Sequence, residues 1–367
     1  MSFKKNVAIF GAGKIGKLVV NLLSNCNDYE ITVYDTSKEN AKKAAYNQIS
    51  GKILDNVNYD AADFMDTKSI ERALQNKNYV LSCAPFYCNK GIAEVARKLK
   101  VHYLDLTEDV KTTSAIKELA KNAQNAFIPQ CGLAPGFITI VAHDLAKEFD
   151  LINSVKMRVG ALPKFPHNKL KYNLTWSTEG LINEYCNPCE VLHNGKLELV
   201  PPLEGLETLS IDGDEYEAFN TSGGLGTLAE SLVHKVKHMD YKSIRYPGHR
   251  EILQILLHDL KFIEDRESLK KIFERALPHT TQDVVIIFVT VTGEKNNQYS
   301  QKSYAKKIYH SDIGEEHWGA IQITTAAGIC AVLDLHANAE LPNSGFIRQE
   351  DISYDKFIKN RFGKYYS

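Results

Sequence analysis

The sequence predicts an α/β protein with a Rossmann-type, doubly wound parallel sheet and a second domain of the α+β class. Three observations support this prediction. An apolar strand runs directly into glycines at the G-x-G-x-x-G spacing, and an aspartate ends the next strand-like run. Short apolar strands alternate with amphipathic helical patterns up to residue 129, and after Gly136 this alternation stops.

The first domain is expected to contain six strands that alternate with five helices. Apolar runs of strand length lie at residues 6–10, 30–34, 53–59, 79–83, 101–105 and 126–129. Helical periodicity lies between them, at residues 14–25, 37–48, 67–76, 89–99 and 111–123. Strands separated by helices pair in parallel, and ligands of such sheets lie at the carboxyl ends of the strands.

The turn after the first strand has the spacing of a dinucleotide-binding site. Gly11 permits the tight turn, Gly13 lets backbone approach a pyrophosphate, and Gly16 allows the helix to pack closely on the strand. Lys14 and Ile15 lie in the same turn, where the helix N-terminus attracts an anion. A glycine-rich turn of an unrelated α/β protein is the alternative, but the flanking strand and helix favour a dinucleotide site.

Asp35 ends the second strand, 19 residues after Gly16, where a carboxylate can accept hydrogen bonds from a ribose hydroxyl. This favours NAD over NADP as the cofactor, because a 2′-phosphate beside Asp35 would be repelled and Lys38 is the only cation nearby in the sequence. Ala84 and Pro85 follow the fourth strand, and we expect them to contact the cofactor as well.

The second domain has a different order of patterns. Strand patterns lie at residues 155–160, 197–200, 216–219 and 284–292, and helical patterns at 137–149, 178–185, 225–234, 248–258 and 267–275. The run 322–335 is a helix rich in Ala and Ile that can pack back on the first domain. We therefore expect a dinucleotide-binding domain over residues 1–132, completed by 322–367, and a substrate and oligomerisation domain over 133–321.

Composition excludes several classes of function. Of the 367 residues 44% are hydrophobic and 24% are charged, with a formal net charge of −1 and no basic block. Nucleic-acid and anionic-membrane binding therefore have no electrostatic support. The N-terminal residues lead directly into the first strand without a signal-peptide pattern, so we expect a cytoplasmic protein whose seven cysteines are reduced.

Cys186 and Cys189 form a C-x-x-C pair, a spacing that can share zinc or form a redox disulfide. A structural zinc site needs two more ligands, and the sequence has no second pair of this kind. His193 is close in sequence but leaves the ligand set incomplete. We expect two reduced thiols and no metal.

Several segments together are similar to the saccharopine dehydrogenase and lysine 6-dehydrogenase family. They occur in the family's order over nearly the whole chain, and they are Cys131–Gly136, Tyr172–Ser177, Glu179–Tyr185, Glu217–Gly224, Ile244–His249 and Gly345–Glu350. The resemblance implies hydride transfer between a nicotinamide dinucleotide and a carbon that bears nitrogen. Oxidation gives an imine, which water hydrolyses to a carbonyl compound. Relatives of this kind are dimers or tetramers, which implies a homodimer here.

The resemblance leaves the substrate open between saccharopine and lysine. Cys131 matches the cysteine of saccharopine reductases, whereas Ala134, where those enzymes usually have Asp, matches lysine 6-dehydrogenases. Two further alternatives also stand. One is a dehydrogenase of another amine-linked compound, such as carboxynorspermidine. The other is a catalytically inactive, NAD-binding sensor or scaffold protein.

The resemblance implies that Asp105, Cys131 and Tyr87 handle protons at the site. Asp105 ends the fifth strand, and a carboxylate there can accept the amine proton or activate water. A structural carboxylate that caps the next loop is the alternative for Asp105, and a buried apolar filler is the alternative for Cys131. Tyr87, or its neighbour Phe86, can instead be an aromatic residue that covers the cleft.

Arg245 is the expected partner of a substrate carboxylate, because its planar guanidinium forms two parallel hydrogen bonds with such a group. Trp176 and Ser177 resemble a substrate-domain motif of the family. Asn220 and Thr221 begin a polar, glycine-rich loop that can present backbone donors to an anion. An interdomain salt bridge, core packing and a plain connecting loop are the corresponding structural alternatives.

Overall fold

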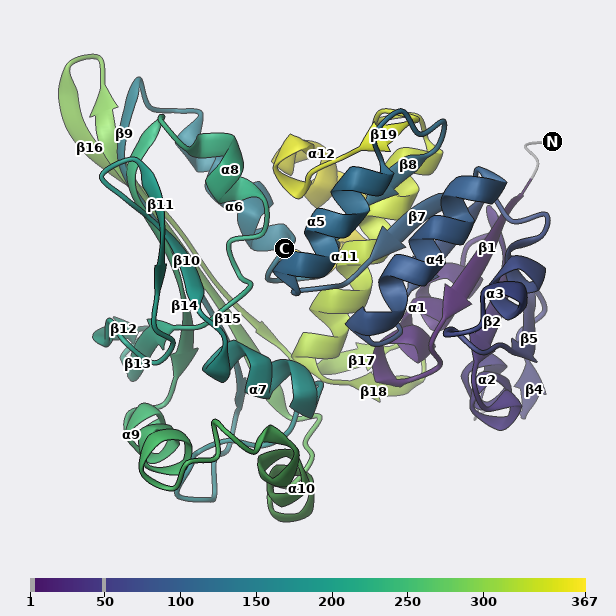
Figure 1. The fold of residues 1–367 in the computed structure, drawn as a ribbon, viewed down its shortest axis with the longest axis horizontal. Helices are drawn as coiled ribbons and strands as arrows, with labels where there is room; N and C mark the ends of the chain where they lie inside the picture. The colour runs from purple at the N-terminus through teal and green to yellow at the C-terminus, as the bar shows by residue number, and fades with distance from the viewer. Residues whose placement is uncertain (1–3, 48–50) are drawn as a thin grey trace. The chain divides into compact units, whose positions relative to one another are not determined.

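The computed structural model describes residues 4–47 and 51–367, and the chain divides into two compact units (Figure 1). The first unit contains the residues up to Phe137 together with Gln322–Ser367, and the second contains Ile138–Ile321. The sequence predicts the first boundary at residue 132, five residues before the end of the first segment of this unit. It predicts the second boundary at the place where the structure has it.

A seven-stranded sheet forms the centre of the first unit, and all its neighbouring strands pair in parallel. In spatial order the strands are β19 (Gly345–Phe346), β8 (Ala126–Ile128), β7 (His102–Asp105), β6 (Tyr79–Ser82), β1 (Lys5–Phe10), β2 (Tyr29–Asp35) and β5 (Val57–Ala61). This confirms the predicted doubly wound fold. The predicted strand 53–59 is partly wrong, because β4 (Lys52–Ile53) pairs instead with β3 (Tyr46–Asn47) in a separate hairpin.

Five helices connect these strands, and side-chain caps explain where several of them begin. They are α1 (Lys14–Ser24), α2 (Lys38–Ala45), α3 (Thr67–Leu74), α4 (Phe86–Leu99) and α5 (Val110–Leu119). Ser37, Asp66 and Asp109 each accept a hydrogen bond from a backbone N–H of the first turn of their helix. The predicted helix 37–48 ends at Ala45, and its last predicted residue lies outside the described residues.

The C-terminal segment completes the first unit. It contains α11 (Ala320–Ala337), β19, α12 (Tyr354–Lys359) and two short 3₁₀ turns, Gln349–Asp351 and Gly363–Tyr366. Asp334 on α11 accepts hydrogen bonds from the Tyr29 hydroxyl at 2.7 Å and the Asn360 amide at 2.8 Å, and it pairs with Arg361. In the described part of the chain, α11 alone is long and apolar enough to cross a membrane, yet 83% of its apolar window is buried, as in a core helix.

An eight-stranded mixed sheet forms the second unit. Six strands follow one another in space: β11 (Lys196–Val200), β10 (Cys189–His193), β14 (Val236–Arg245), β9 (Leu151–Pro163), β15 (Asp283–Lys295) and β16 (Gln298–Tyr309). Two more, β12 (Glu207–Ile211) and β13 (Asp214–Asn220), pair with each other, and β13 also pairs with β14. A two-stranded hairpin, β17 (Ser311–Ile313) with β18 (Glu316–Trp318), follows them.

The second unit contains five helices, and three of them share an apolar core. The five helices are α6 (Phe137–Ala146), α7 (Thr178–Cys186), α8 (Leu228–Leu232), α9 (His249–Gln254), which continues as a π-helical turn (Ile255–Asp259), and α10 (Arg266–Ala276). Leu181, Leu253 and Phe273, from α7, α9 and α10, belong to one buried cluster. This cluster also contains Tyr172, so the segment before α7 is fixed by packing.

The strand β14 is absent from the sequence prediction, and its ion pairs explain why. Arg158 on β9 is buried and pairs with Asp240 of β14 at 2.9 Å and with Glu207 of β12. Lys242 of β14 pairs with the same Glu207 at 3.1 Å. Charged residues that are paired with a neighbouring strand can be buried in a sheet, but they remove the apolar alternation by which a strand is found.

A half-buried histidine of the first unit makes stability depend on pH. The His102 Nδ1 accepts a hydrogen bond from the Ala126 N–H at 3.1 Å, and its ring lies 4.4 Å from the His336 ring. Burial, together with the positive charges of His336 and Lys5, lowers the pKa of His102 to about 4. An unfolded histidine has a pKa near 6.5. The folded state therefore favours neutral His102, and this contribution to stability is lost as pH falls from about 6.5 to 4.

We expect the free energy of unfolding of the wild type to fall more steeply over that pH range than that of a His102→Asn variant. Asparagine keeps an acceptor for the Ala126 N–H but does not titrate. Urea unfolding at pH 7, 6, 5 and 4 measures both slopes. Parallel slopes for the two proteins would contradict a protonation-linked role for His102.

Candidate functional site

Two glycines of the turn after β1 are required by close backbone contacts. Gly11 has a φ of +98°, and a Cβ at this position would lie 2.7 Å from the Cys83 carbonyl oxygen at the end of β6. A Cβ at Gly16 would lie 1.8 Å from the Gly11 carbonyl oxygen. The first turn of α1 therefore packs directly against the end of β1, as the sequence predicts.

Gly13 differs from its neighbours because a Cβ there would meet no atom within 4 Å. Gly13 is the N-cap of α1, and no side chain caps this helix. The backbone N–H groups at the helix N-terminus thus border open space beside a backbone without a side chain. An anion such as a pyrophosphate fits this arrangement. Lys14 and Ile15 form the first turn of α1, and burial lowers the pKa of Lys14.

Asp35 lies at the end of β2, the neighbour of β1, and its carboxylate holds the glycine turn. One carboxylate oxygen accepts a hydrogen bond from the Ala12 N–H at 2.9 Å, and the other accepts one from the Ser37 N–H at 3.0 Å. Lys38 pairs with Asp60 at 2.9 Å. Because each carboxylate oxygen can accept more than one hydrogen bond, Asp35 can also receive ribose hydroxyls.

The strand order places this turn where ligands of such sheets bind. The strand β1 lies between β2 and β6, so the chain changes direction across the sheet at the carboxyl end of β1. Ala84 and Pro85 follow β6 at this same edge, and Pro85 is the N-cap of α4. The predicted cofactor residues of β1, β2 and β6 therefore share one edge of the sheet.

Asp105, the predicted proton-handling residue, is fully buried and organises the loop after β8. Its carboxylate accepts hydrogen bonds from the Tyr103 hydroxyl at 2.7 Å, the Thr107 N–H at 3.0 Å and the Gln130 N–H at 2.9 Å. Burial raises the pKa of Asp105 to about 6, although these three donors favour the charged form. The geometry gives Asp105 a clear positioning role for the loop that contains Cys131.

Cys131 is buried in that loop. Its Sγ donates to the Ile128 carbonyl oxygen at 2.9 Å and lies 3.3 Å from the Gln349 amide nitrogen. Burial, with the charge of Asp105, raises the pKa of the Cys131 thiol well above its usual value, so the thiol is neutral. Tyr87 has the opposite environment: it is 54% exposed in the first turn of α4 and contacts Phe86 edge to face.

In the second unit, the predicted carboxylate-binding residue Arg245 ends β14 within a chain of hydrogen bonds. The Arg245 Nε–H donates to the Tyr185 hydroxyl at 2.8 Å, and this hydroxyl lies 3.1 Å from the His249 Nε2. The His249 Nδ1 lies 2.8 Å from the Leu170 carbonyl oxygen, which can only accept, so Nδ1 carries the proton. Burial and the Arg245 charge lower the pKa of His249 to about 3, which keeps this ring neutral.

Arg245 retains donors that no described residue uses. Its guanidinium lies between the rings of Tyr172 and Tyr185, with centroid distances of 5.2 and 5.6 Å. Of its five N–H groups, one donates to Tyr185 and one to the Ile244 carbonyl oxygen, which leaves three. Its Nη2 lies 3.7 Å from a Glu184 oxygen, beyond hydrogen-bond length. A buried arginine with unused donors suits an anionic ligand.

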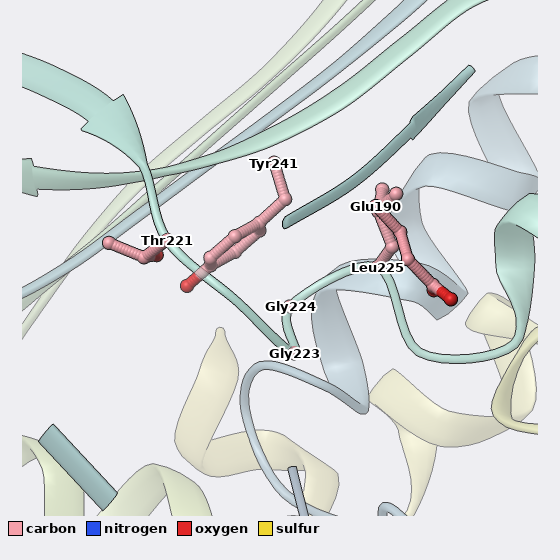
Figure 2. Close-up of a pocket in the computed structure, with 6 residues that line it drawn as sticks. All are labelled: Glu190, Thr221, Gly223, Gly224, Leu225 and Tyr241. Carbon is pink, nitrogen blue, oxygen red and sulfur yellow. The ribbon is translucent and has the colours of Figure 1, made fainter. Parts of the chain in front are cut away.

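A small hollow lies in the same unit (Figure 2). Thr221, Gly223 and Gly224 of the predicted loop line it, together with Leu225, Glu190 of β10 and Tyr241 of β14. Figure 2 shows the Tyr241 side chain extending toward Thr221. A Cβ at Gly224 would lie 2.3 Å from the Tyr241 ring, so the loop packs closely on this ring. The Thr221 hydroxyl lies 2.8 Å from that of Ser243.

Three other predicted substrate residues have identifiable structural contacts. Ser177 is the N-cap of α7, and its hydroxyl accepts a hydrogen bond from the Gly180 N–H at 3.2 Å. Trp176 is partly buried against the apolar core of the second unit. Asn220 ends β13, and its backbone pairs with Leu203 and Glu204. Their predicted contacts with substrate stay predictions.

Cys186 and Cys189 are both buried free thiols, and burial raises the pKa of each. Across residues 4–47 and 51–367, no three His, Cys, Asp or Glu side chains are grouped so that they can hold a metal ion. A low-pKa, reactive thiol needs an electropositive and accessible environment. The burial of this pair therefore gives no support to a redox role.

Two family models cover most of the chain. Residues 7–128 match the saccharopine dehydrogenase NADP binding domain, and residues 132–364 match the saccharopine dehydrogenase C-terminal domain. The chain belongs to the saccharopine dehydrogenase family. This confirms the resemblance found in its sequence motifs.

The matched region is less than two thirds of the length of each of two curated relatives. The mitochondrial alpha-aminoadipic semialdehyde synthase of Rattus norvegicus is 28% identical over 233 residues, which are 58% of this chain and 24% of that protein. The saccharopine dehydrogenase [NADP(+), L-glutamate-forming] of Saccharomyces cerevisiae is 22% identical over 276 residues, which are 71% of this chain and 59% of that protein.

A solved structure supports the fold. The apo saccharopine dehydrogenase (L-Glu forming) of Saccharomyces cerevisiae superimposes with a TM-score of 0.77 at 16% identity, and the match covers 94% of each chain. At this identity the likeness concerns the fold alone. Both the parallel sheet and the mixed sheet of this chain thus belong to the architecture of a saccharopine dehydrogenase.

Sequence reasoning assigned no role to Glu184, Tyr185 and Tyr241 of this saccharopine dehydrogenase family member. Glu184 and Tyr185 belong to a segment that carried the family resemblance, but the helical pattern of α7 does not show that they face Arg245. Tyr241 lies on β14, the strand that the sequence did not predict. These residues come together through the pairing of β13 with β14 and the packing of α7, which are tertiary contacts.

Proposed function

We propose that this chain is a pyridine-nucleotide-dependent oxidoreductase that oxidises a C–N bond of an amino acid, either saccharopine or lysine. The unused N–H groups of buried Arg245 are the observation that carries the substrate class, because they suit a carboxylate. The glycine turn and Asp35 support the cofactor class. Membership of the saccharopine dehydrogenase family supports the reaction type.

Each group of residues has a distinct task in this reaction. A bound nicotinamide dinucleotide would supply the hydride acceptor for the carbon that bears nitrogen, and water would hydrolyse the resulting imine. Gly13 and the N-terminus of α1 bind the pyrophosphate, and Asp35 binds a ribose hydroxyl. Arg245 orients the substrate through its carboxylate. Asp105 holds the loop of Cys131 in place, because its carboxylate accepts a hydrogen bond from the Gln130 N–H and its carbonyl oxygen accepts one from the Cys131 N–H.

A substrate panel tests this proposal. Purified protein is mixed with saccharopine, L-lysine or carboxynorspermidine and with NAD or NADP, and the absorbance of the reduced nucleotide is followed. We expect turnover of saccharopine or L-lysine, with a much larger KM in an Arg245→Lys variant, because lysine cannot reproduce the planar guanidinium contact. Tight nucleotide binding without turnover of any compound would overturn the enzyme proposal and favour a sensor or scaffold.

We further propose that NAD is preferred over NADP, and this rests on Asp35 alone. The matching domain is described as NADP binding, and the yeast relative carries NADP(+) in its name. In this chain a carboxylate ends β2, and the nearby Lys38 is paired with Asp60. A 2′-phosphate here would face a negative charge.

We expect Asp35→Ser to lower kcat/KM for NAD at least tenfold and to raise it for NADP. Serine removes the charge and retains a hydroxyl that can bind a phosphate oxygen. The ratio of kcat/KM for the two cofactors, measured in the wild type and the variant, tests this expectation. A Thr36→Ser exchange in the same loop is the matched control. A wild type that prefers NADP would refute the preference.

A further inference from the structure

We propose that Glu184 and Arg245 together bind an α-amino-acid zwitterion, with Arg245 holding the carboxylate and Glu184 the ammonium group. This inference rests on the proposed function and deepens it, because it names the end of the substrate that the second unit recognises. It also gives a specificity role to Glu184, a residue for which the sequence indicated none.

The two charges have the separation that this task requires. The Glu184 Oε2 and the Arg245 Nη2 lie 3.7 Å apart, and their side chains are only 11% and 3% exposed. Both side chains are therefore nearly shielded from water, but the Glu184 oxygen and the Arg245 nitrogen are too far apart for a hydrogen bond. An α-amino acid carries its carboxylate and its ammonium group on the same carbon atom. It can bring one opposite charge to each member of such a pair.

Two hydroxyl groups in the segment before α7 lack hydrogen-bond partners in the part of the chain that the structure describes. The hydroxyls of Tyr172 and Thr175 are buried and have no hydrogen-bond partner of normal geometry among the described residues. Burial raises the pKa of Tyr172, while Thr175 and Trp176 lie close enough to its hydroxyl to oppose this rise. Buried hydroxyls without partners are rare in folded proteins. Because the Tyr172 ring lies against the Arg245 guanidinium, a polar ligand held by Arg245 can supply the hydrogen bond that the Tyr172 hydroxyl lacks.

Glu184 and Arg245 do not line the hollow of Figure 2, but Tyr241 and the loop at Ser222 connect them with it. Tyr241, which lines the hollow, is close enough to Glu184 and Arg245 for both charges to affect the pKa of its hydroxyl, which burial raises strongly. The backbone N–H of Ser222, in the loop that lines the hollow, donates to the Glu184 carbonyl oxygen at 3.1 Å. The loop therefore connects the hollow with the residue proposed to bind the ammonium group.

The test compares two ligands that differ only in the α-ammonium group. L-lysine and 6-aminohexanoate are titrated by calorimetry into the protein saturated with NADH, so that no turnover occurs. Because a charge-assisted hydrogen bond is lost, we expect L-lysine to bind at least about tenfold more tightly than 6-aminohexanoate. In Glu184→Gln this difference should disappear while the affinity for 6-aminohexanoate stays the same. In Arg245→Lys both ligands should bind more weakly.

Glu179→Gln is the matched control, because Glu179 lies on the same helix, is 45% exposed and pairs with Lys270. It should leave both affinities unchanged. A merely structural role for Glu184 would weaken both ligands in parallel, and that result would overturn the inference. Equal binding of the two ligands by the wild type would overturn it without any variant. These results concern binding, so a failure of the proposed function, seen as absent turnover with every amine, is a separate observation.

Discussion

Replacing Gly16 by alanine is expected to destabilise the protein by about 3 kcal/mol, because the added methyl group has no room. The new Cβ would lie 1.8 Å from the Gly11 carbonyl oxygen, which is backbone and cannot move independently of β1. Helix α1 would have to shift away from the sheet. Urea unfolding and nucleotide titration should both show the loss. A Gly16→Ala protein with normal stability would contradict the close packing described for this turn.

Gly13→Ala is the matched control, three residues earlier in the same motif. A methyl group there would meet no protein atom within 4 Å, and the Gly13 φ of −70° suits alanine. We expect this variant to unfold at the same urea concentration as the wild type. It should bind NADH or NADPH ten- to a hundredfold more weakly, because the methyl group occupies the space proposed for the pyrophosphate. Unchanged affinity for both nucleotides would place the dinucleotide elsewhere.

Replacing Asp105 by leucine is expected to cost about 3–5 kcal/mol of stability, since three buried donors lose their acceptor. These donors are the Tyr103 hydroxyl and the backbone N–H groups of Thr107 and Gln130. Asp105→Asn should cost about 1 kcal/mol or less. Its amide oxygen can accept from the two N–H groups, while its amide nitrogen can donate to the Tyr103 hydroxyl.

The contribution of Asp105 to stability should change with pH in a definite direction. Burial raises the pKa of Asp105 to about 6, above the value of 3.8 for an ordinary aspartate. The folded protein therefore holds this proton more tightly, and the contribution of the group to stability falls as pH rises from 3.8 to 6. Asp105→Asn should lack this fall. Turnover should survive in Asp105→Asn if Asp105 only positions the loop, and its loss in a stably folded variant would assign proton handling to Asp105.

The nucleotide-binding half of the fold could be predicted from the sequence, because the motif and the patterns that indicate it are local. The glycines, the preceding strand and Asp35 lie within 35 residues, and each element carries its own periodicity. The predicted strands 6–10, 30–34, 79–83, 101–105 and 126–129 all occur within one or two residues of these bounds. Apolar parallel strands that alternate with helices leave few topologies open.

The strands of the second unit were harder to predict from the sequence, because they bury charged residues or expose polar ones. The strand β14 contains Asp240 and Lys242, which pair with β9 and β12, and β16 is an edge strand with a largely exposed polar sequence. Neither shows the alternation that identifies a half-buried strand. β19 is two residues long and is a strand only because β8 lies beside it.

The sequence by itself determined the doubly wound fold and the dinucleotide turn, and it singled out Arg245 as a candidate, since these follow from short-range patterns and from the chemistry of single residues. Only the tertiary structure decided what surrounds them. It buried Asp105 among three donors and placed Glu184 and Tyr185 beside Arg245. Such partners come from elements far apart in the chain. Hydrogen bonds and pKa values depend on distance and burial, which no local pattern encodes.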